Sequence, residues 1–407
     1  MRRSSRAELA VLQETCRALI RVRGEESAAS LAGLAVRRYG LLTTTDKAIF
    51  FRFLLAEFGP QHSDIEAAIA AYESDARPAN AQALEIAASA PRQQLFKAMN
   101  TADGGTACIL TMRADCVAAT RIEPVLRPVE NDLARLIEAW FNRGFLELEH
   151  IDWDTPAAVL EKLIAYEAVH EIRGWDDLRR RLETDRRCFG FFHPALPGEP
   201  LIFVEVALTA GLQTSIQAVI DAPSPDDPTS EKPDTAIFYS ITNCQAGLAG
   251  IPLGSFLLKQ VTDELVRSVE GLARFSTLSP VPGFVTWVTE TGGGLASDVV
   301  TSMLAGDQRI DDDHETAVTA ACANYLVNAK RDRQPLDPVA RFHLRNGARL
   351  EQINWRGDIS TKGIGESYGL LVNYVYDPAE LADNHEAYVN ENRVAHSSAV
   401  AQLLDDD

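Results

Sequence analysis

The chain has 407 residues, of which 46% are hydrophobic and 24% charged, and its formal net charge at pH 7 is −19. This composition excludes a disordered chain, and the length exceeds the range of about 250 to 300 residues at which a single hydrophobic core stops growing, so we expect two domains. The strong negative charge excludes nucleic acid and anionic membranes as partners, and it requires any site for an anionic ligand to be locally basic or lined by backbone N–H groups.

The chain begins MRRSSRAELAVLQETCRALI, which lacks the apolar core of a signal peptide, and no stretch of about 18 apolar residues occurs anywhere. We therefore expect a soluble cytoplasmic protein. The cysteines form no C-x-x-C pair and no spacing with histidine that suits zinc, which predicts reduced thiols and no metal site. They are Cys16, Cys108, Cys116, Cys188, Cys244 and Cys322.

Residues 1 to about 140 are expected to be helical almost throughout, because apolar residues recur at spacings of three and four. The pattern is clearest at 65–76, 80–90, 91–100 and 129–144. This part of the chain holds no cluster of candidate catalytic side chains. We place an all-helical domain at residues 1–143.

From residue 144 onward the pattern predicts strands in series. They are expected at 145–151, 188–193, 200–209, 235–244 and 275–284. A short turn with proline and glycine joins the second and third, as in a hairpin, and an amphipathic helix at 255–266 separates the last two. Antiparallel strands followed by a strand–helix–strand crossover predict a mixed α/β sheet, so the fold class is α+β with a second domain at 144–407.

The segment QAGLAGIPLGS joins the strand at 235–244 to the helix that follows, and it contains Gly247, Gly250 and Gly254. Glycine lets the backbone approach a ligand closely, and the first N–H groups of a helix are free to bind a phosphate. The spacing matches neither a Walker loop nor a dinucleotide-binding motif. Glycines at a helix start also serve tight turns without a ligand, so this feature alone leaves both interpretations open.

Antiparallel strands, this turn and the helix after it resemble the GCN5-related acetyltransferase fold, whose turn binds the pyrophosphate of coenzyme A. The corresponding residues are Ala249, Gly250, Ile251, Pro252, Leu253, Gly254 and Ser255. Ala249 stands where that family usually has Gln or Arg, so the resemblance implies binding through backbone donors.

Longer strings resemble the malonyl-CoA decarboxylase family and cover most of residues 145–376 in order. They are YEAVHEIRGWDDLRRRL, RRCFGFFHPALPGEPLIFVEVALT, FYSITNCQAGLAGIPLGSFLLKQV, FSTLSPVPGF, FHLRNGARLEQINWRGDIS and SYGLLVNYVYD. The resemblance implies a helical oligomerisation domain, tetramers, and an acetyltransferase-like domain that converts malonyl-CoA to acetyl-CoA and CO₂ without a metal or organic cofactor. By motif, its catalytic pair corresponds to Ser279 and His343.

Decarboxylation of a malonyl thioester leaves an enolate, so the site must accommodate the carboxylate, stabilise the thioester oxygen and protonate carbon. We expect His343 to bind and orient the carboxylate and Ser279 to relay the proton, with backbone N–H groups near the end of strand 235–244 as oxyanion donors. Without the resemblance, a histidine in the strand-like segment ARFHLRN suggests a structural role, and a serine before proline suggests a turn.

Basic residues are concentrated at 179–187, and Lys259 lies on the helix after the glycine turn. Such a charge run usually forms a solvated face, and the alternatives are contact with the CoA phosphates or with a neighbouring subunit. Two further functions remain open: an acetyl-CoA-dependent acyltransferase, and a non-catalytic acyl-CoA sensor.

Overall fold

The computed structural model describes residues 2–223, 232–251, 254–305 and 314–405. It consists of two compact units. The helical unit comprises the described residues within Met1–Glu147, Phe192–Glu199 and Gln245–Pro252, and the sheet unit comprises those within Leu148–Phe191, Pro200–Cys244 and Leu253–Asp407. The expected domain boundary at 143/144 stays a prediction. In the described part of the chain, no helix is both long and apolar enough to cross a membrane.

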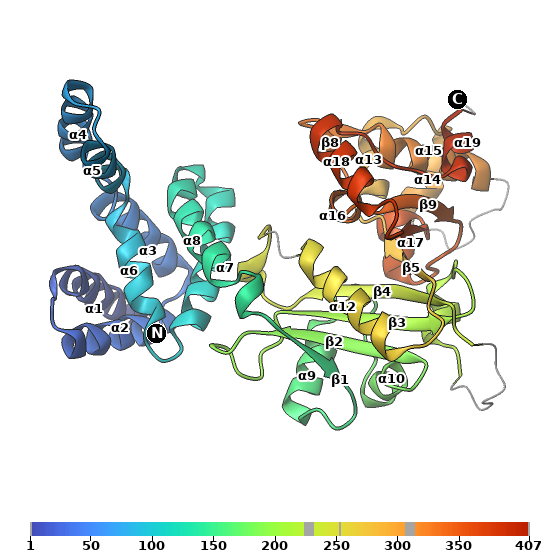
Figure 1. Cartoon of the computed structure of the whole chain (residues 1–407), viewed down its shortest axis with the longest axis horizontal. Helices are drawn as coiled ribbons and strands as arrows, with labels where there is room; N and C mark the ends of the chain where they lie inside the picture. Colours follow the sequence, from blue (N-terminus) through green and yellow to red (C-terminus); the bar gives the residue numbers. More distant parts are fainter. Residues whose placement is uncertain (1, 224–231, 252–253, 306–313, 406–407) are drawn as a thin grey trace. The chain divides into compact units, whose positions relative to one another are not determined.

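The helical unit contains the helices that the spacing of apolar residues predicts (Figure 1). They are α1 (Arg2–Arg21), α2 (Glu25–Gly40), α3 (Thr44–Glu57), α4 (His62–Ser74), α5 (Pro78–Ala88), α6 (Pro91–Asn100), α7 (Gly105–Ile122) and α8 (Arg127–Trp140), with the 3-10 helices η1 (Pro124–Leu126), η2 (Arg143–Phe145) and η3 (Ala246–Leu248). In α8 the buried residues Val129, Leu133 and Leu136 lie on one face, which is the arrangement of a helix packed against a core.

The sheet unit combines strands and helices. Its strands are β1 (Glu147–Ile151), β2 (Arg186–Phe192), β3 (Ile202–Thr209), β4 (Thr235–Asn243), β5 (Arg274–Thr277), β6 (Ser279–Pro280), β7 (Lys330–Arg331), β8 (Gln334–Pro335), β9 (Arg349–Asn354) and β10 (Leu371–Val375). Its helices are α9 (Ala157–Tyr166), α10 (Trp175–Arg181), α11 (Ile216–Ile220), α12 (Gly254–Ser268), α13 (Phe284–Thr291), α14 (Ser297–Ala305), α15 (Glu315–Val327), α16 (Pro338–Arg345), α17 (Thr361–Ser367), α18 (Leu381–Glu391) and α19 (Ser398–Asp405).

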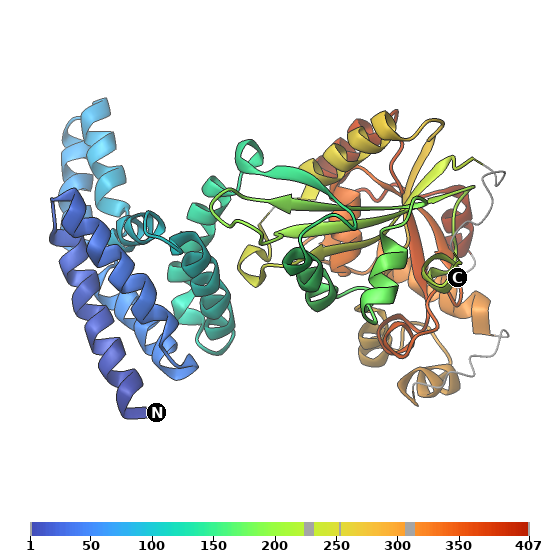
Figure 2. The same ribbon diagram turned by 90° about the horizontal axis from the view of Figure 1, so that it is seen from below.

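The main sheet has the strand order β1-β2-β3-β4-β5-β10-β6, with β9 paired to β10. Strands β2, β3 and β4 are antiparallel neighbours, whereas β4 and β5 are parallel and are joined through α12. The predicted fold class, a helical N-terminal region followed by a mixed α/β sheet, is therefore confirmed. Helices α9 and α10 lie on one side of the sheet and α12 on the other (Figures 1 and 2).

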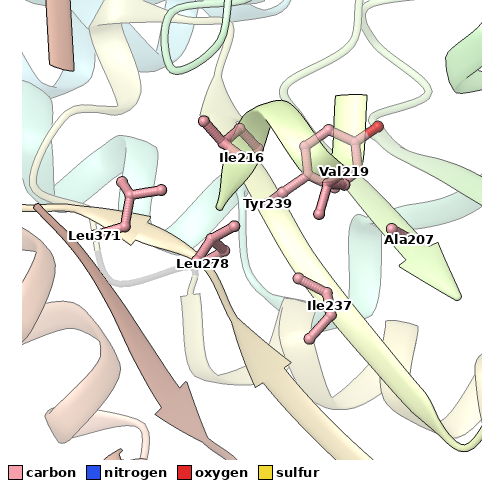
Figure 3. Packing of buried hydrophobic residues seen from close by; sticks show 7 residues of the cluster. All are labelled: Ala207, Ile216, Val219, Ile237, Tyr239, Leu278 and Leu371. Carbon is pink, nitrogen blue, oxygen red and sulfur yellow. The ribbon is translucent and has the colours of Figure 1, made fainter. Parts of the chain in front are cut away.

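A core of buried apolar side chains joins the sheet to α11 (Figure 3). Its members are Ala207, Ile216, Val219, Ile237, Tyr239, Leu278 and Leu371. Because these residues come from β3, β4, β10 and the segment between β5 and β6, the core fixes the short strand β6 beside β10. That strand begins at Ser279.

The segment at 275–284 is less regular than the single strand expected there. It forms β5 up to Thr277 and the two-residue strand β6, and α13 begins at Phe284. Pro280 and Pro282 explain why β6 ends after two residues, because a proline has no N–H to donate to a neighbouring strand.

Candidate active site

Ser279 and His343, which are 64 residues apart in the sequence, meet in the sheet unit. The Oγ atom of Ser279 lies 3.1 Å from Nε2 of His343, within hydrogen-bond distance. Only 6% of the surface of Ser279 and 3% of that of His343 are exposed. The structure thus brings the two predicted catalytic residues together in a nearly dry environment.

His343 lies in a helix, α16, and the strand-like environment suggested by ARFHLRN is wrong. Pro338 occupies the first turn, and the Asp337 carboxylate caps the helix by accepting a hydrogen bond of 2.8 Å from the N–H of Ala340. Proline and an aspartate cap both favour a helix start at this position. His343, Ala340 and Leu344 form the buried face of α16, which explains the apolar spacing around the histidine.

Both ring nitrogens of His343 have hydrogen-bond partners. Nε2 contacts Ser279, and Nδ1 lies 2.6 Å from the hydroxyl of Tyr376. The ring also stacks on Tyr374, with centroids 4.6 Å apart and planes 22° from parallel. Burial lowers the pKa of His343 from 6.5 to about 3, because the charged form loses its hydration. The imidazole is therefore neutral at physiological pH.

The Ser279 hydroxyl is oriented by the neighbouring strands. It donates a hydrogen bond of 2.9 Å to Oγ1 of Thr277, which in turn accepts one of 3.2 Å from the backbone N–H of Tyr374 on β10. In this arrangement Ser279 accepts the Nε2 proton of His343, and Tyr376 donates to Nδ1. A continuous chain of hydrogen bonds thus runs from Thr277 through Ser279 and His343 to Tyr376.

Two buried asparagines support this chain from the adjacent strands. The side-chain amide of Asn373 donates to the backbone carbonyls of Thr277 (2.8 Å) and Gln213 (3.0 Å), and its Oδ1 accepts a bond of 2.7 Å from Asn354. The Oδ1 atom of Asn354 is buried without a hydrogen-bond partner in the described part of the chain.

Sequence reasoning missed Tyr376, Asn373 and Asn354. A signal for Asn373 and Tyr376 existed in LLVNYVYD, where an asparagine and two tyrosines interrupt an otherwise apolar run. Polar groups in a buried strand require partners, so their presence there indicates a network.

The expected CoA turn is described in part. Leu248, Ala249, Gly250 and Ile251 form a β-turn closed by a 3.0 Å hydrogen bond from the N–H of Ile251 to the carbonyl of Leu248. Ala249 has φ −55° and ψ 127°, and Gly250 has φ +76°, the values of a type II turn that requires glycine at its third position.

The other residues of the expected CoA turn lie further along the chain. Gly254 and Ser255 open α12, and Pro252 and Leu253 lie outside the described residues. Lys259, a weaker candidate for CoA contact, is exposed on α12. The β-turn belongs to the helical unit, and the Ser279–His343 pair belongs to the sheet unit.

The arginines at 179–187 make internal contacts. Arg181 is 1% exposed and pairs with Glu205 and Asp177 at 3.0 Å each, and Arg186 pairs with Asp185 at 2.6 Å. The remaining arginines likewise bond within the sheet unit: Arg179 lies over the ring of Trp153, Arg180 pairs with Asp185, and Arg187 donates to the carbonyls of Thr184 and Arg186. The charge run is thus neither a simple solvated face nor a free anion site.

Comparisons with known proteins agree with this architecture. The model of the malonyl-CoA decarboxylase C-terminal domain matches residues 144–407, and that of the N-terminal domain matches residues 58–141. The mitochondrial malonyl-CoA decarboxylase of Anser anser anser is 35% identical over 345 residues, covering 76% of this chain and 68% of the goose protein. That of Mus musculus is 32% identical over 408 residues, covering 90% of this chain and 83% of the mouse protein.

Two crystal structures of bacterial malonyl-CoA decarboxylases match nearly the whole chain. The Rhodopseudomonas palustris structure is 42% identical with a TM-score of 0.87, covering 97% of this chain and 99% of that one. The Agrobacterium vitis structure is 41% identical with a TM-score of 0.89, covering 96% and 99%. With both domain models matched in order, this chain belongs to the malonyl-CoA decarboxylase family.

Proposed function

We propose that this protein decarboxylates malonyl-CoA to acetyl-CoA and CO₂, and that Ser279 and His343 are its catalytic pair. The observation that carries the proposal is the 3.1 Å contact between Ser279 Oγ and Nε2 of a buried, neutral His343. A role in fatty acid metabolism would follow from this substrate.

The reaction breaks the bond between the α-carbon and the carboxylate. The electron pair of that bond moves into the thioester as an enolate, and CO₂ leaves. Ser279 then gives its hydroxyl proton to the α-carbon and is reprotonated from Nε2 of His343, while Nδ1 takes the hydroxyl proton of Tyr376 so that the imidazole stays neutral. One proton taken up from solvent per turnover restores the starting protonation of the three groups, so the overall reaction consumes one proton and releases one CO₂.

The neutral state of His343 supports the relay role for this residue. Both ring nitrogens already have partners, so neither is free to orient the substrate carboxylate, the role expected from sequence. A buried imidazole without charge also offers no ion pair that would hold the carboxylate in place. We therefore place Ser279, and not His343, next to the substrate.

The pyrophosphate of CoA is proposed to bind at the segment from Ala249 to Ser255. The type II turn supports this assignment, because Gly250 is an exposed residue whose N–H donates to no backbone carbonyl in the part of the chain that the structure describes. Gly254 and Ser255 open α12, where the first N–H groups of a helix favour an anion.

Product analysis tests the proposal. Purified protein is incubated with malonyl-CoA and EDTA without an acceptor, and CO₂ and acetyl-CoA are followed by mass spectrometry; both should appear in equal amounts. Ser279→Ala should lower kcat by about 10² to 10⁴-fold. Ser276→Ala is the matched control, because Ser276 is a buried neighbour on β5 whose hydroxyl bonds to the Thr277 carbonyl.

Two outcomes would contradict the proposal. Intact malonyl-CoA despite measurable binding would identify an acyl-CoA sensor. Release of free CoA from acetyl-CoA only when an amine acceptor is added would identify an acyltransferase.

We also propose that the protein is a homotetramer and that it is located in the cytoplasm. The family resemblance supports the assembly, and six free thiols support a reducing compartment. Cell fractionation tests the location, and recovery of the protein from mitochondria would overturn it.

A further inference from the structure

Arg113 on α7 holds the expected CoA turn from inside the helical unit. Its Nη1 atom donates to the carbonyl oxygens of Gly247 (2.6 Å) and Ala249 (2.8 Å), residues 134 and 136 positions further along the chain. The side chain is buried, with 5% exposed. One guanidinium therefore bonds two backbone carbonyls at the start of the turn.

The guanidinium is itself held by α8. Nε and Nη2 of Arg113 donate to one oxygen of Glu130, at 3.2 and 2.9 Å. Glu130 balances the charge of Arg113 and uses donors that could otherwise reach a ligand. Arg113 can thus act on a bound anion through the backbone it orients, not by direct contact.

Helix α7 also touches the turn through its backbone. A Cβ atom added to Gly247 would lie 2.2 Å from the carbonyl oxygen of Leu110, so only glycine allows this approach. The segment is thereby fixed on α7 by two independent contacts, one to the Arg113 side chain and one to the main chain at Leu110.

The contact to Ala249 sets the direction of a hydrogen-bond donor. The carbonyl of Ala249 and the N–H of Gly250 belong to the same peptide group, and no cis peptide bonds occur among the described residues. In a planar trans peptide the C=O and N–H point in opposite directions. Because Arg113 binds the carbonyl, the N–H of Gly250 is directed away from α7, toward the exposed side of the turn.

We propose that Arg113 is a positioning residue for the CoA pyrophosphate: by fixing the Ala249–Gly250 peptide, the helical unit contributes to CoA affinity. This inference rests on the proposed function of the turn. It assigns α7 a role in substrate binding that is separate from any role in assembly.

The test compares two substrates that differ only in the part of CoA that the turn binds. Malonyl-CoA carries the pyrophosphate, and malonyl-pantetheine lacks it. Arg113→Gln should raise KM for malonyl-CoA roughly tenfold, because two hydrogen bonds to the turn are lost, with kcat changed less than about twofold. The kcat/KM for malonyl-pantetheine should be unchanged, since that substrate makes no use of the turn.

Arg92→Gln is the matched control. Arg92 is also buried in the helical unit, with 4% exposed, and it bonds Asp132 of α8 at 2.6 Å and the carbonyls of Phe58 and Pro128. It makes no contact with the turn, so its replacement should leave the ratio of the two substrates' kcat/KM values unchanged.

Gly247→Ala provides a second variant in case Arg113→Gln does not fold. Its methyl group should displace the turn from α7 and selectively raise KM for malonyl-CoA in the same way. Gly40→Ala, where an added Cβ meets nothing within 4 Å, is its control.

The inference would be overturned if the Arg113 variant lost kcat/KM equally for malonyl-CoA and malonyl-pantetheine. It would also be overturned if a folded Arg113 variant kept the wild-type KM for malonyl-CoA. Failure of the proposed function looks different, because then the wild type itself does not turn over malonyl-CoA. In that case calorimetry with CoA and pantetheine decides: weaker binding of CoA alone to the Arg113 variant supports the inference, and unchanged binding overturns it.

Discussion

His343 is neutral because it is buried, and this state should be visible in the pH dependence of stability. An unfolded histidine has a pKa of about 6.5, whereas burial lowers that of folded His343 to about 3. Between these values the unfolded chain binds more protons than the folded one. The stability that depends on neutral His343 is therefore fully present above pH 6.5 and is lost as the pH falls toward 3.

His343→Gln should remove this dependence. Wild type should lose up to about 1.4 kcal/mol more stability than His343→Gln for each pH unit between 6.5 and 5. Thermal unfolding midpoints followed by tryptophan fluorescence at pH 5 to 7.5 measure the difference. Parallel curves for the two proteins would show that His343 titrates normally in the folded state.

Tyr376 fixes the tautomer of His343 through its 2.6 Å contact to Nδ1. In Tyr376→Phe this nitrogen loses its partner, so the Nε2–H form that faces Ser279 is less favoured. We expect kcat to fall roughly tenfold with little change in KM. Tyr374→Phe serves as the control because it keeps the ring that stacks on His343. Equal kcat values for Tyr376→Phe and wild type would exclude this role.

At the scale of elements, the start of α16 determines where His343 lies. Asp337 caps this helix, and burial raises the pKa of its carboxyl to about 6. A short helix with one strong cap has few other interactions to define its first turn, so the position of His343 depends on a residue six positions earlier.

Asp337→Ala should therefore lower both stability and turnover. Loss of the cap costs about 0.5 to 2 kcal/mol, which lowers the unfolding temperature by about 2 to 4 °C per kcal/mol in a domain of this size. Asp337→Asn keeps an acceptor for the Ala340 N–H and should retain most of both properties. Scanning fluorimetry gives the unfolding temperature of each variant, and steady-state kinetics gives its kcat. If Asp337→Asn lost as much stability and turnover as Asp337→Ala, the cap would not explain the effect.

At the scale of the whole molecule, α4 and α5 mark a surface suited to subunit contact. Neither helix contains a buried residue, and Ile69, Tyr72 and Ile86 are exposed. Short helices are marginal in water and gain most of their stability from packing. We propose that these two helices pack against another copy of the chain.

Light scattering after size-exclusion chromatography tests this surface. Ile69→Glu combined with Ile86→Glu should reduce the molar mass from that of the oligomer, because two charges would be buried at the contact. Ile122→Glu, at an 83% exposed position on α7 of the same unit, should leave the mass unchanged. A monomeric wild type, or a double variant with the full mass, would contradict the proposal.

The sequence by itself determined the kinds of elements and their order. Apolar spacing predicted the N-terminal helices and the series of strands, since burial on one face leaves a period of 3.6 or 2 in the chain. Glycine spacing predicted a turn between the strand at 235–244 and the helix after it, because glycine allows tight turns and close approach of the backbone. Resemblance to a family selected Ser279 and His343, which composition and periodicity alone would have left as structural residues.

Only the tertiary structure decided which residues of these elements contact one another. The contacts of Ser279 with His343, of Tyr376 with His343, and of Arg113 with the turn join residues 33 to 136 positions apart. Periodicity shows that a face is buried but not which partner covers it. Protonation follows the same logic: the low pKa of His343 arises from the loss of water around the ring, and that loss is produced by elements distant in the sequence.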